Sequence, residues 1–166
     1  RQFEMVSNRP LERQGPIDMK LPGGCLCGGV RYEVDGPLAE ASHCHCSMCR
    51  RFHGAAFATY VSVEIEKFHW LHGEDLVCVY EPNPGAGWAF CRVCGSSLGL
   101  PREGKLASLA VGCLDDDPGT RPAYHMFVGS KALWYEITDA LPQFMERPPE
   151  GDMTIIGTNP DVQRQR

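Results

Sequence analysis

The chain has 166 residues, of which 43% are hydrophobic and 22% charged, and its formal net charge is −5 at pH 7. This length suits a single domain. The acidic charge disfavours non-specific binding to nucleic acid or to anionic membranes, and no apolar run approaches the roughly 20 residues that cross a bilayer. We therefore expect neither nucleic acid nor membrane as a target.

Both ends of the chain are predicted to be tails. Residues 1–20 are polar, show no periodicity and carry no signal-peptide pattern, which predicts a disordered or tag-like tail and a cytoplasmic protein. The domain is predicted to occupy residues 21–146, and the Pro-rich residues 147–166 to form a C-terminal tail. The 18 glycines and 13 prolines indicate many turns, so the domain is expected to be mainly β.

Alternating apolar residues predict several strands along the domain. Val30, Tyr32 and Val34 alternate with charged residues, as in a half-buried strand. In residues 57–65 the same period would place alternate side chains on one buried face. Further strands are expected in 75–81, 88–100, 105–114 and from 124, a loop at 81–87, a turn at 115–122 and a helical turn after Cys49.

Two cysteine pairs have the spacing of a structural zinc site. Residues i and i+2 of an extended chain point the same way, so a C-x-C can direct two sulfurs at one ion. A C-x-x-C followed by glycine does the same through a tight turn. The two pairs together would form a closed tetrahedral Cys₄ zinc site joining the start of the domain to its middle; the alternative is four free buried thiols. The four residues are Cys25, Cys27, Cys91 and Cys94.

A second cluster offers only three sulfurs, from Cys44, Cys46 and Cys49. Extended geometry would direct Cys44 and Cys46 to one side and the intervening histidines to the other, so His45 is not expected to be a fourth ligand. Three protein ligands and one open position are typical of catalytic zinc. Two alternatives remain: a fourth ligand closes the site, or the cysteines are redox-active thiols without metal. The candidates for that fourth ligand are His53, Cys78 and Cys113.

The remaining candidates have weaker signals. Arg50 and Arg51 follow Cys49 and are expected either to bind substrate carboxylates and offset thiolate charge or to form a solvated surface pair. Cys78 and Cys113 are predicted to be small buried residues. Trp134 is expected in the core, or in a pocket with Lys131 and Tyr135. Packing or surface positions are predicted for His69, His72 and His125.

Four segments in this order, GGCLCGGVRY, CHCSMCRRFHGA, FCRVCGSSL and HMFVGSKALWYEITDALPQF, resemble the glutathione-dependent formaldehyde-activating enzyme family, which includes centromere-protein-V-like members. The resemblance covers about residues 21–146. It implies a single domain of several coiled antiparallel β-sheets around zinc sites, related to zinc ribbons. It also implies two zinc ions, one structural on Cys25, Cys27, Cys91 and Cys94, and one catalytic on Cys44, Cys46 and Cys49.

For the activity, the resemblance implies a carbon–sulfur lyase that forms S-hydroxymethylglutathione from glutathione and formaldehyde, or a related thiol–aldehyde adduct. The alternative function is a non-catalytic zinc module that binds glutathione or a partner protein. An open three-cysteine site would favour the enzyme, and a fourth protein ligand would favour the module. A nucleic-acid-binding zinc protein is disfavoured by the acidic charge and the lack of a basic run.

Overall fold

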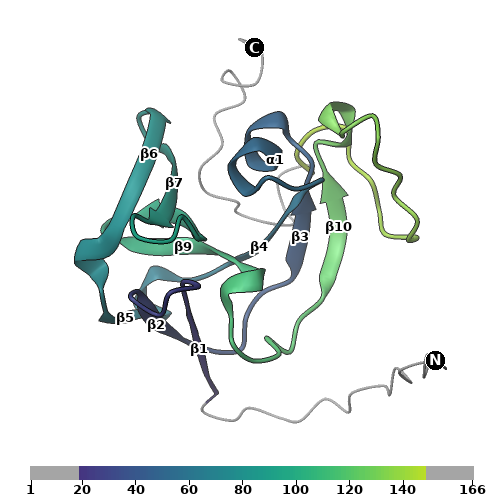
Figure 1. Cartoon of the computed structure of the whole chain (residues 1–166). Helices are drawn as coiled ribbons and strands as arrows, with labels where there is room; N and C mark the ends of the chain where they lie inside the picture. The colour runs from purple at the N-terminus through teal and green to yellow at the C-terminus, as the bar shows by residue number, and fades with distance from the viewer. Residues whose placement is uncertain (1–18, 149–166) are drawn as a thin grey trace, which may run out of the picture.

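Two β-sheets account for most of the regular structure in residues 19–148, the part of the chain that this computed structural model describes. The predicted tails therefore fall almost entirely outside the described residues, although Lys20 already belongs to the first strand. Figure 1 shows the short helix at one side of the domain, near β3 and β10, with β1, β2 and β5 farther away. The domain is mainly β, as the sequence predicts. None of the helices in the described part is long and apolar enough to cross a membrane.

The smaller sheet is antiparallel and has three strands in the order β1-β2-β5. The larger sheet has seven strands in the order β10-β3-β4-β9-β8-β7-β6, and only the β3–β10 pair is parallel. The strands are β1 (Lys20–Gly24), β2 (Arg31–Asp35), β3 (Ala41–Cys44), β4 (Ala58–Ser62), β5 (Phe68–His72), β6 (Val77–Asn83), β7 (Ala86–Cys91), β8 (Ser97–Arg102), β9 (Lys105–Ala110) and β10 (Pro122–Met126).

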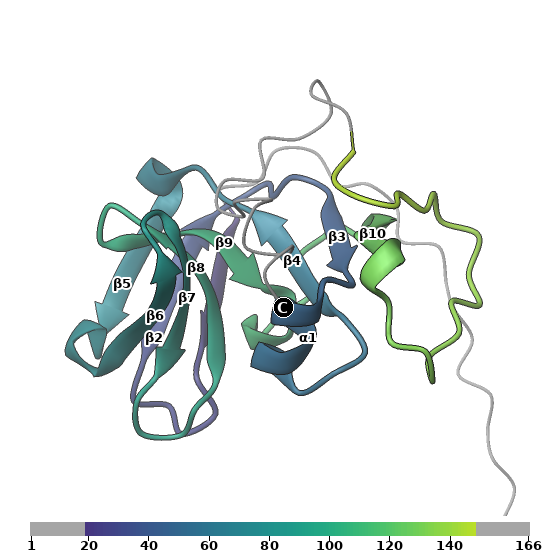
Figure 2. The same ribbon diagram turned by 90° about the horizontal axis from the view of Figure 1, so that it is seen from above.

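One α-helix, α1 (Ser47–His53), packs next to β4 and lies close to β3 and β10 (Figures 1 and 2). It begins before Cys49, not after it as the sequence suggests, because Cys46 caps its N-terminus: the Cys46 sulfur accepts the N–H of Cys49. Gly54 ends the helix in the left-handed conformation, where a Cβ is costly. The 3₁₀ turns are η1 (Ile65–Lys67), η2 (Glu74–Leu76), η3 (Val111–Cys113) and η4 (Val128–Ser130).

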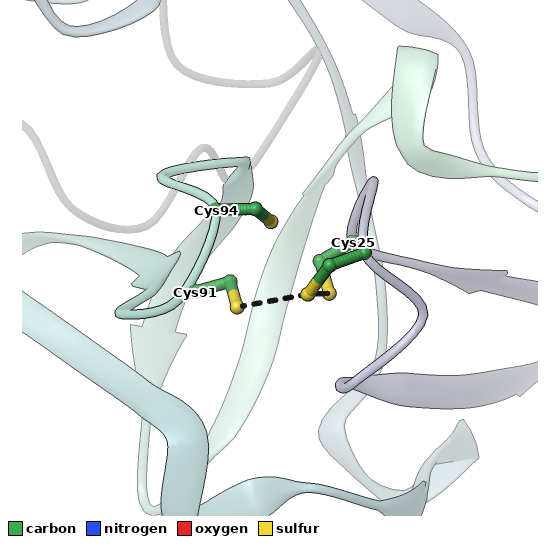
Figure 3. Close-up of side chains that lie close together, drawn as sticks. Cys25, Cys91 and Cys94 are labelled. Atoms are coloured by element: carbon green, nitrogen blue, oxygen red, sulfur yellow. Dashed lines mark hydrogen bonds between the residues drawn. The ribbon is translucent and has the colours of Figure 1, made fainter.

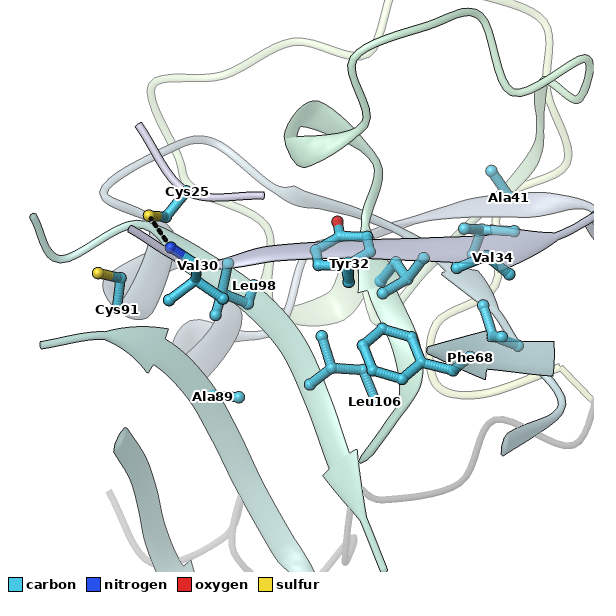
Figure 4. Packing of buried hydrophobic residues seen from close by; sticks show 13 residues of the cluster. Cys25, Val30, Tyr32, Val34, Ala41, Phe68, Ala89, Cys91, Leu98 and Leu106 are labelled. Carbon is cyan, nitrogen blue, oxygen red and sulfur yellow. Dashed lines mark hydrogen bonds between the residues drawn. The ribbon is translucent and has the colours of Figure 1, made fainter. Parts of the chain in front are cut away.

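A first core cluster packs the small sheet against the large one. Tyr32 and Phe68, with ring centroids 5.3 Å apart, pack with Leu106 of the large sheet, and all three side chains are fully buried (Figure 4). Cys25 and Cys91 belong to the same cluster and lie at one end of it. The first cysteine cluster is therefore an extension of the core, so its geometry depends on this packing.

A second core cluster contains the other three cysteines. Strand β4 borders both clusters, because Val61 on one face packs in the first, while Ala58 and Tyr60 on the other face pack in the second. The sequence predicts burial of only one face of this segment; the structure buries both, since α1 covers the face that would otherwise meet solvent. Cys44 and Trp88 are further members of the second cluster.

The predicted strand at residues 30–34 is confirmed as β2. The strands predicted at 57–65 and 105–114 are shorter in the structure, the one predicted at 75–81 is displaced by two residues, and the one predicted at 88–100 is divided into β7 and β8. Strands β1 and β5 were not predicted. The prediction of a loop at 81–87 is wrong for most of these residues, because only Pro84 and Gly85 separate β6 from β7. This hairpin closes tightly because the N–H of Gly85, whose φ is 77°, donates to the Glu81 carboxylate at 2.6 Å.

Candidate metal centres

The first candidate centre brings Cys25, Cys27, Cys91 and Cys94 together, with all four sulfurs within 4.8 Å of one another (Figure 3). Cys25 and Cys27 follow β1, Cys91 ends β7, and Cys94 lies in the turn before β8. The separation is 3.4 Å between the sulfurs of Cys25 and Cys27 and 3.9 Å between those of Cys27 and Cys91. A tetrahedral zinc with bonds of about 2.3 Å would place its sulfurs roughly 3.8 Å apart, so the donor set fits this ion.

Backbone hydrogen bonds fix both turns of this centre. The N–H of Val30 donates to the Cys25 sulfur at 3.2 Å, and the N–H of Gly95 donates to the Cys91 carbonyl. Hydrogen bonding from the Ser96 side chain and backbone lowers the pKa of Cys94 to about 5. The Gly29 N–H favours the Cys27 thiolate, but the thiols of Cys25 and Cys94 outweigh it and the pKa of Cys27 is raised to about 12. Four crowded sulfurs thus cannot all ionise without a cation.

The second candidate centre consists of Cys44, Cys46 and Cys49, again with all sulfurs within 4.8 Å of one another. Cys44 ends β3, Cys46 caps α1 and Cys49 lies in its first turn, and all three are at most 1% exposed. The Cys44 thiol, together with Cys49, lowers the pKa of Cys46 to about 3. Three soft sulfur donors, of which Cys46 strongly favours the thiolate form, also suit a zinc ion.

The structure does not bring a fourth side-chain ligand to this centre. Among residues 19–148, no other histidine, cysteine or carboxylate atom lies within the 4.8 Å group. His53, Cys78 and Cys113, the predicted candidates for a closing ligand, therefore stand apart from it. His53 instead hydrogen-bonds Tyr60, and the Cys113 thiol donates to the Ser97 carbonyl at 3.0 Å.

The histidines next to these cysteines lie on the opposite face of the sheet, as the sequence predicts. Cys44 stands opposite Ala58 on the face covered by α1, whereas His43 stands opposite Thr59 on the other face and hydrogen-bonds its hydroxyl at 2.9 Å. His45 packs against His125, with ring centroids 5.0 Å apart, and not against the sulfurs. The sheet thus separates a cysteine face from a histidine face.

A hydrogen-bond chain runs along the histidine face from two buried histidines to the exposed Asp139. His45 Nε2 lies 2.8 Å from His125 Nδ1, and His125 Nε2 lies 3.1 Å from both carboxylate oxygens of Asp139. Desolvation lowers the pKa of His43 and of His45 to about 4, so both are neutral at neutral pH.

His125 is a buried packing residue, which is one of the two positions predicted for it. Its hydrogen bonds to His45 and Asp139 were not predicted, because no short-range sequence pattern links it to Asp139.

A cleft of about 450 Å³ opens beside the second centre. Its wall includes Phe52 and His53, one helical turn beyond Cys49, and Ala58, which pairs with Cys44. Ser96 and Ser97, which follow the second pair of the first centre, also line it. The cleft is therefore bordered by segments that adjoin both cysteine centres, although none of the seven cysteines of these centres lines it. It is lined by Phe52, His53, Ala55, Phe57, Ala58, Thr59, Gly95, Ser96, Ser97, Ala110, Gly112 and Cys113.

The two arginines after Cys49 differ in their surroundings. Arg50 is half-buried and donates to the carbonyls of His45 and Ser130, at 3.2 and 3.0 Å. It therefore holds the loop before α1 to the turn η4. Arg51 is exposed, so the arginine pair is not a uniformly solvated surface pair.

Other side chains lie elsewhere than predicted. Trp134 is 75% exposed, which excludes a place in the core. Cys78 and Cys113 are only half-buried, since Cys78 lies on the edge strand β6 and Cys113 in a short 3₁₀ turn beside the cleft. Neither is the fully buried residue that the sequence suggests.

Comparison with known proteins adds three findings. The family model described as "Glutathione-dependent formaldehyde-activating enzyme" matches residues 20–130. A protein of Halomonas elongata named "Putative glutathione-dependent formaldehyde-activating enzyme" is 30% identical over 130 residues, which cover 72% of this chain and 82% of that protein. A crystal structure of a Rhodobacter sphaeroides protein is 28% identical, covers 58% of this chain and 89% of its own, and gives a TM-score of 0.47.

Proposed function

The chain belongs to the glutathione-dependent formaldehyde-activating enzyme family, and from this membership we propose that it is a zinc-dependent carbon–sulfur lyase acting on a thiol–aldehyde adduct. Glutathione and formaldehyde, named in the family description, are the proposed substrates. The proposed activity resides in residues 21–146, with Cys25, Cys27, Cys91 and Cys94 holding a structural zinc and Cys44, Cys46 and Cys49 a catalytic one.

The observation that carries this proposal is the group of three buried sulfurs, to which the described residues add no fourth ligand. A zinc ion held there would supply a positive charge that polarises a carbonyl and favours a thiolate over a thiol. The surrounding apolar side chains exclude water, so this charge would act in a medium of low dielectric constant. The cleft beside the helix supplies room for the non-reacting part of the thiol.

The reaction needs no oxidant or reductant. A sulfur–carbon bond forms, the carbonyl π bond breaks, and the thiol proton ends on the new hydroxyl oxygen. The protein must therefore align the two reactants and provide for the movement of one proton. For alignment, we assign Arg51, exposed at the end of α1, and the free edge of the Arg50 guanidinium to the carboxylates of the thiol substrate.

The decisive experiment combines zinc content with catalysed exchange. Two-dimensional exchange NMR on glutathione and formaldehyde measures how fast the adduct forms and breaks, with and without protein. The wild type should bind two zinc ions and accelerate exchange, whereas Cys46→Ser should bind one and lose the acceleration. Cys78→Ser is the matched control, since Cys78 belongs to neither centre, and it should behave as the wild type. A wild type that binds two zinc ions without accelerating exchange would refute the proposed activity.

A second candidate function rests on the burial of the same sulfurs. Because Cys44, Cys46 and Cys49 are at most 1% exposed, a metal held by them would be shielded from substrate unless side chains move. A non-catalytic zinc module that binds glutathione in the cleft is the function this burial would favour. Saturable binding of glutathione without any acceleration of adduct exchange would identify it.

A further inference from the structure

The cleft beside α1 presents no charged side chain. None of the described residues that line it is a lysine, arginine, aspartate or glutamate, although 22% of the chain is charged. Burial lowers the pKa of His53, the histidine of the cleft, which keeps its ring neutral at neutral pH. A carboxylate or ammonium group that entered the cleft would therefore lose hydrating water without meeting an opposite charge.

The polar side chains of the cleft already have partners within the protein. Each of them hydrogen-bonds another group of the chain at 2.7 to 3.2 Å. A ligand in the cleft therefore meets an uncharged surface whose polar side chains do not depend on it for a hydrogen bond. The pairs are His53 with the hydroxyls of Tyr60 and Ser97, Ser96 with the N–H of Leu26, Thr59 with His43, and Cys113 with the Ser97 carbonyl.

The cleft is much larger than a formaldehyde molecule. Its volume of about 450 Å³ lies in the range of small-molecule pockets. Ala58 and Ala110 line it and belong to the second core cluster, and Phe52, which also lines it, packs against that cluster. A group held in the cleft would thus lie beside the cluster that contains the three cysteines of the second centre, without touching their sulfurs.

The arginines assigned to the substrate carboxylates are not part of the cleft. Neither Arg50 nor Arg51 lines it. On these assignments, the carboxylates of the thiol and the content of the cleft are different parts of the bound adduct. The cleft favours an apolar group, because its walls are made mostly of glycine, alanine and phenylalanine residues, against which apolar surface leaves water.

We propose that the cleft binds an uncharged apolar substituent of the thiol–aldehyde adduct, of about the size of a benzyl group. This inference rests on the proposed function, to which it adds a substrate class: one of the two reactants carries a bulky apolar group that formaldehyde lacks. The aldehyde and the thiol are both possible sources of this group, and the kinetic test below distinguishes them.

Nuclear magnetic resonance with probes of one size tests the preference for an uncharged group. Benzyl alcohol, benzylamine, which is an ammonium ion at pH 7, and benzoate share the same ring. Titrated into the full zinc-loaded chain, benzyl alcohol should shift the backbone N–H resonances of Gly95, Ser97 and Gly112 in a saturable way. The two charged probes should bind at least about tenfold more weakly. Equal binding of all the probes, or no saturable shift with benzyl alcohol, would overturn the inference.

Gly112 allows the cleft to be filled without disturbing the fold. It lines the cleft, its φ is not positive, and a Cβ added to it would have nothing within 4 Å. Gly112→Leu should therefore weaken benzyl alcohol binding at least about tenfold, because the leucine occupies volume that the probe needs, and should keep the zinc content. Ala39→Leu is the matched control, since Ala39 is exposed and outside the cleft, and it should bind the probe as the wild type does.

A second position keeps this test decisive if Gly112→Leu does not fold. Ala55 is exposed and also lines the cleft, so Ala55→Leu should weaken benzyl alcohol binding in the same direction. Benzyl alcohol that binds a folded, zinc-loaded cleft variant as tightly as the wild type would overturn the inference.

Adduct exchange kinetics show which reactant supplies the substituent. One reaction pairs glutathione with phenylacetaldehyde, another pairs benzyl mercaptan with formaldehyde, and glutathione with formaldehyde is the reference. Gly112→Leu should lower kcat/KM for a substituted pair, relative to the reference pair, at least about tenfold. A fall with phenylacetaldehyde assigns the substituent to the aldehyde, and a fall with benzyl mercaptan assigns it to the thiol. Unchanged ratios in both reactions would overturn the inference.

The two proposals fail in different ways. Benzyl alcohol binding that Gly112→Leu abolishes, in a protein that does not accelerate any adduct exchange, would leave the apolar cleft standing and refute the lyase. Accelerated exchange of glutathione and formaldehyde, in a protein whose cleft takes up no benzyl alcohol, would refute the apolar cleft and leave the lyase standing.

Discussion

Cys44 and His43 are consecutive residues of β3 whose side chains lie on opposite faces of the seven-stranded sheet. Cys44 faces α1 together with Ala58, and His43 faces the hydrogen-bond chain that ends at Asp139. One peptide unit thus separates a soft sulfur donor set from a set of neutral imidazoles. A shift of one residue in the β3–β4 register would exchange the two sets, so this register decides which chemistry lies under the helix.

The two cysteine centres should differ in their importance for folding. Cys91 is buried in the first core cluster, and structural zinc sites of this kind contribute about 10–16 kcal/mol. This exceeds or matches the whole stability of most domains, so Cys91→Ser should not fold, whereas Cys46→Ser should fold and bind one zinc fewer. Circular dichroism melting and zinc analysis check both outcomes. A cooperatively folded Cys91→Ser protein would contradict the structural role.

Of the two arginines assigned to the substrate, Arg50 should also contribute to stability, whereas Arg51 should not. Arg50 donates to two backbone carbonyls, so Arg50→Ala should lower the free energy of unfolding by about 1–3 kcal/mol. Arg51 is exposed, so Arg51→Ala should change it by less than about 0.5 kcal/mol and raise KM for glutathione. Urea unfolding and exchange kinetics measure the two effects. An unchanged KM in Arg51→Ala would remove this arginine from the substrate site.

Gly73 should tolerate no side chain. Its φ is 75°, and a Cβ would lie 1.8 Å from the Gly29 carbonyl oxygen, in the loop that carries Cys27. Gly73→Ala should therefore lower the free energy of unfolding by roughly 3 kcal/mol or more. Gly85 has a φ of 77° with nothing within 4 Å of the added Cβ, so Gly85→Ala isolates the cost of the backbone conformation, about 1 kcal/mol. Equal losses in the two variants would contradict the steric account.

The histidine face should make the fold sensitive to acid. Desolvation, with a contribution from His125, lowers the pKa of His43 to about 4, and an unfolded histidine titrates near 6.5. Between these values the unfolded chain binds more protons, so the folded state loses stability as the pH falls from 6.5 towards 4. Above pH 6.5 the ring is neutral in both states and the contribution is constant.

His43→Gln removes this titration while keeping a group that can hydrogen-bond Thr59. The melting temperature of the wild type should therefore fall relative to that of the variant as the pH is lowered from 7 to 4.5. Taking the difference between two proteins with the same cysteines cancels the loss of zinc in acid. A difference that stays constant with pH would contradict the neutral state of the half-buried His43.

The spacing within each cysteine pair, and within Cys44, Cys46 and Cys49, was predictable from sequence because it is local. Alternation along an extended chain is enough to separate Cys44 and Cys46 from the histidine between them. The strand at 30–34 was predictable for the same reason. β1 and β5 were not, since KLPGG contains two glycines and a proline, and FHWLH has no clear alternation; pairing with β2 makes both of them strands.

The elements of the site that escaped prediction depend on long-range packing. His125 and Asp139 meet because the segment after η4 returns to β10, where Phe144 donates to the His125 carbonyl. The exposure of Trp134 could not be predicted either, because the local sequence does not indicate whether a tryptophan in a loop packs against the core.

The chain separation of the two cysteine centres sets an order in which they can be assembled during synthesis. Cys27 and Cys91 are 64 residues apart, so the four-cysteine site cannot close until the β7–β8 turn has left the ribosome. Cys44, Cys46 and Cys49 emerge together and much earlier. The three sulfurs of the proposed catalytic centre are therefore together on the nascent chain before the scaffold that fixes them exists, and a zinc ion would meet this proposed centre before the proposed structural one.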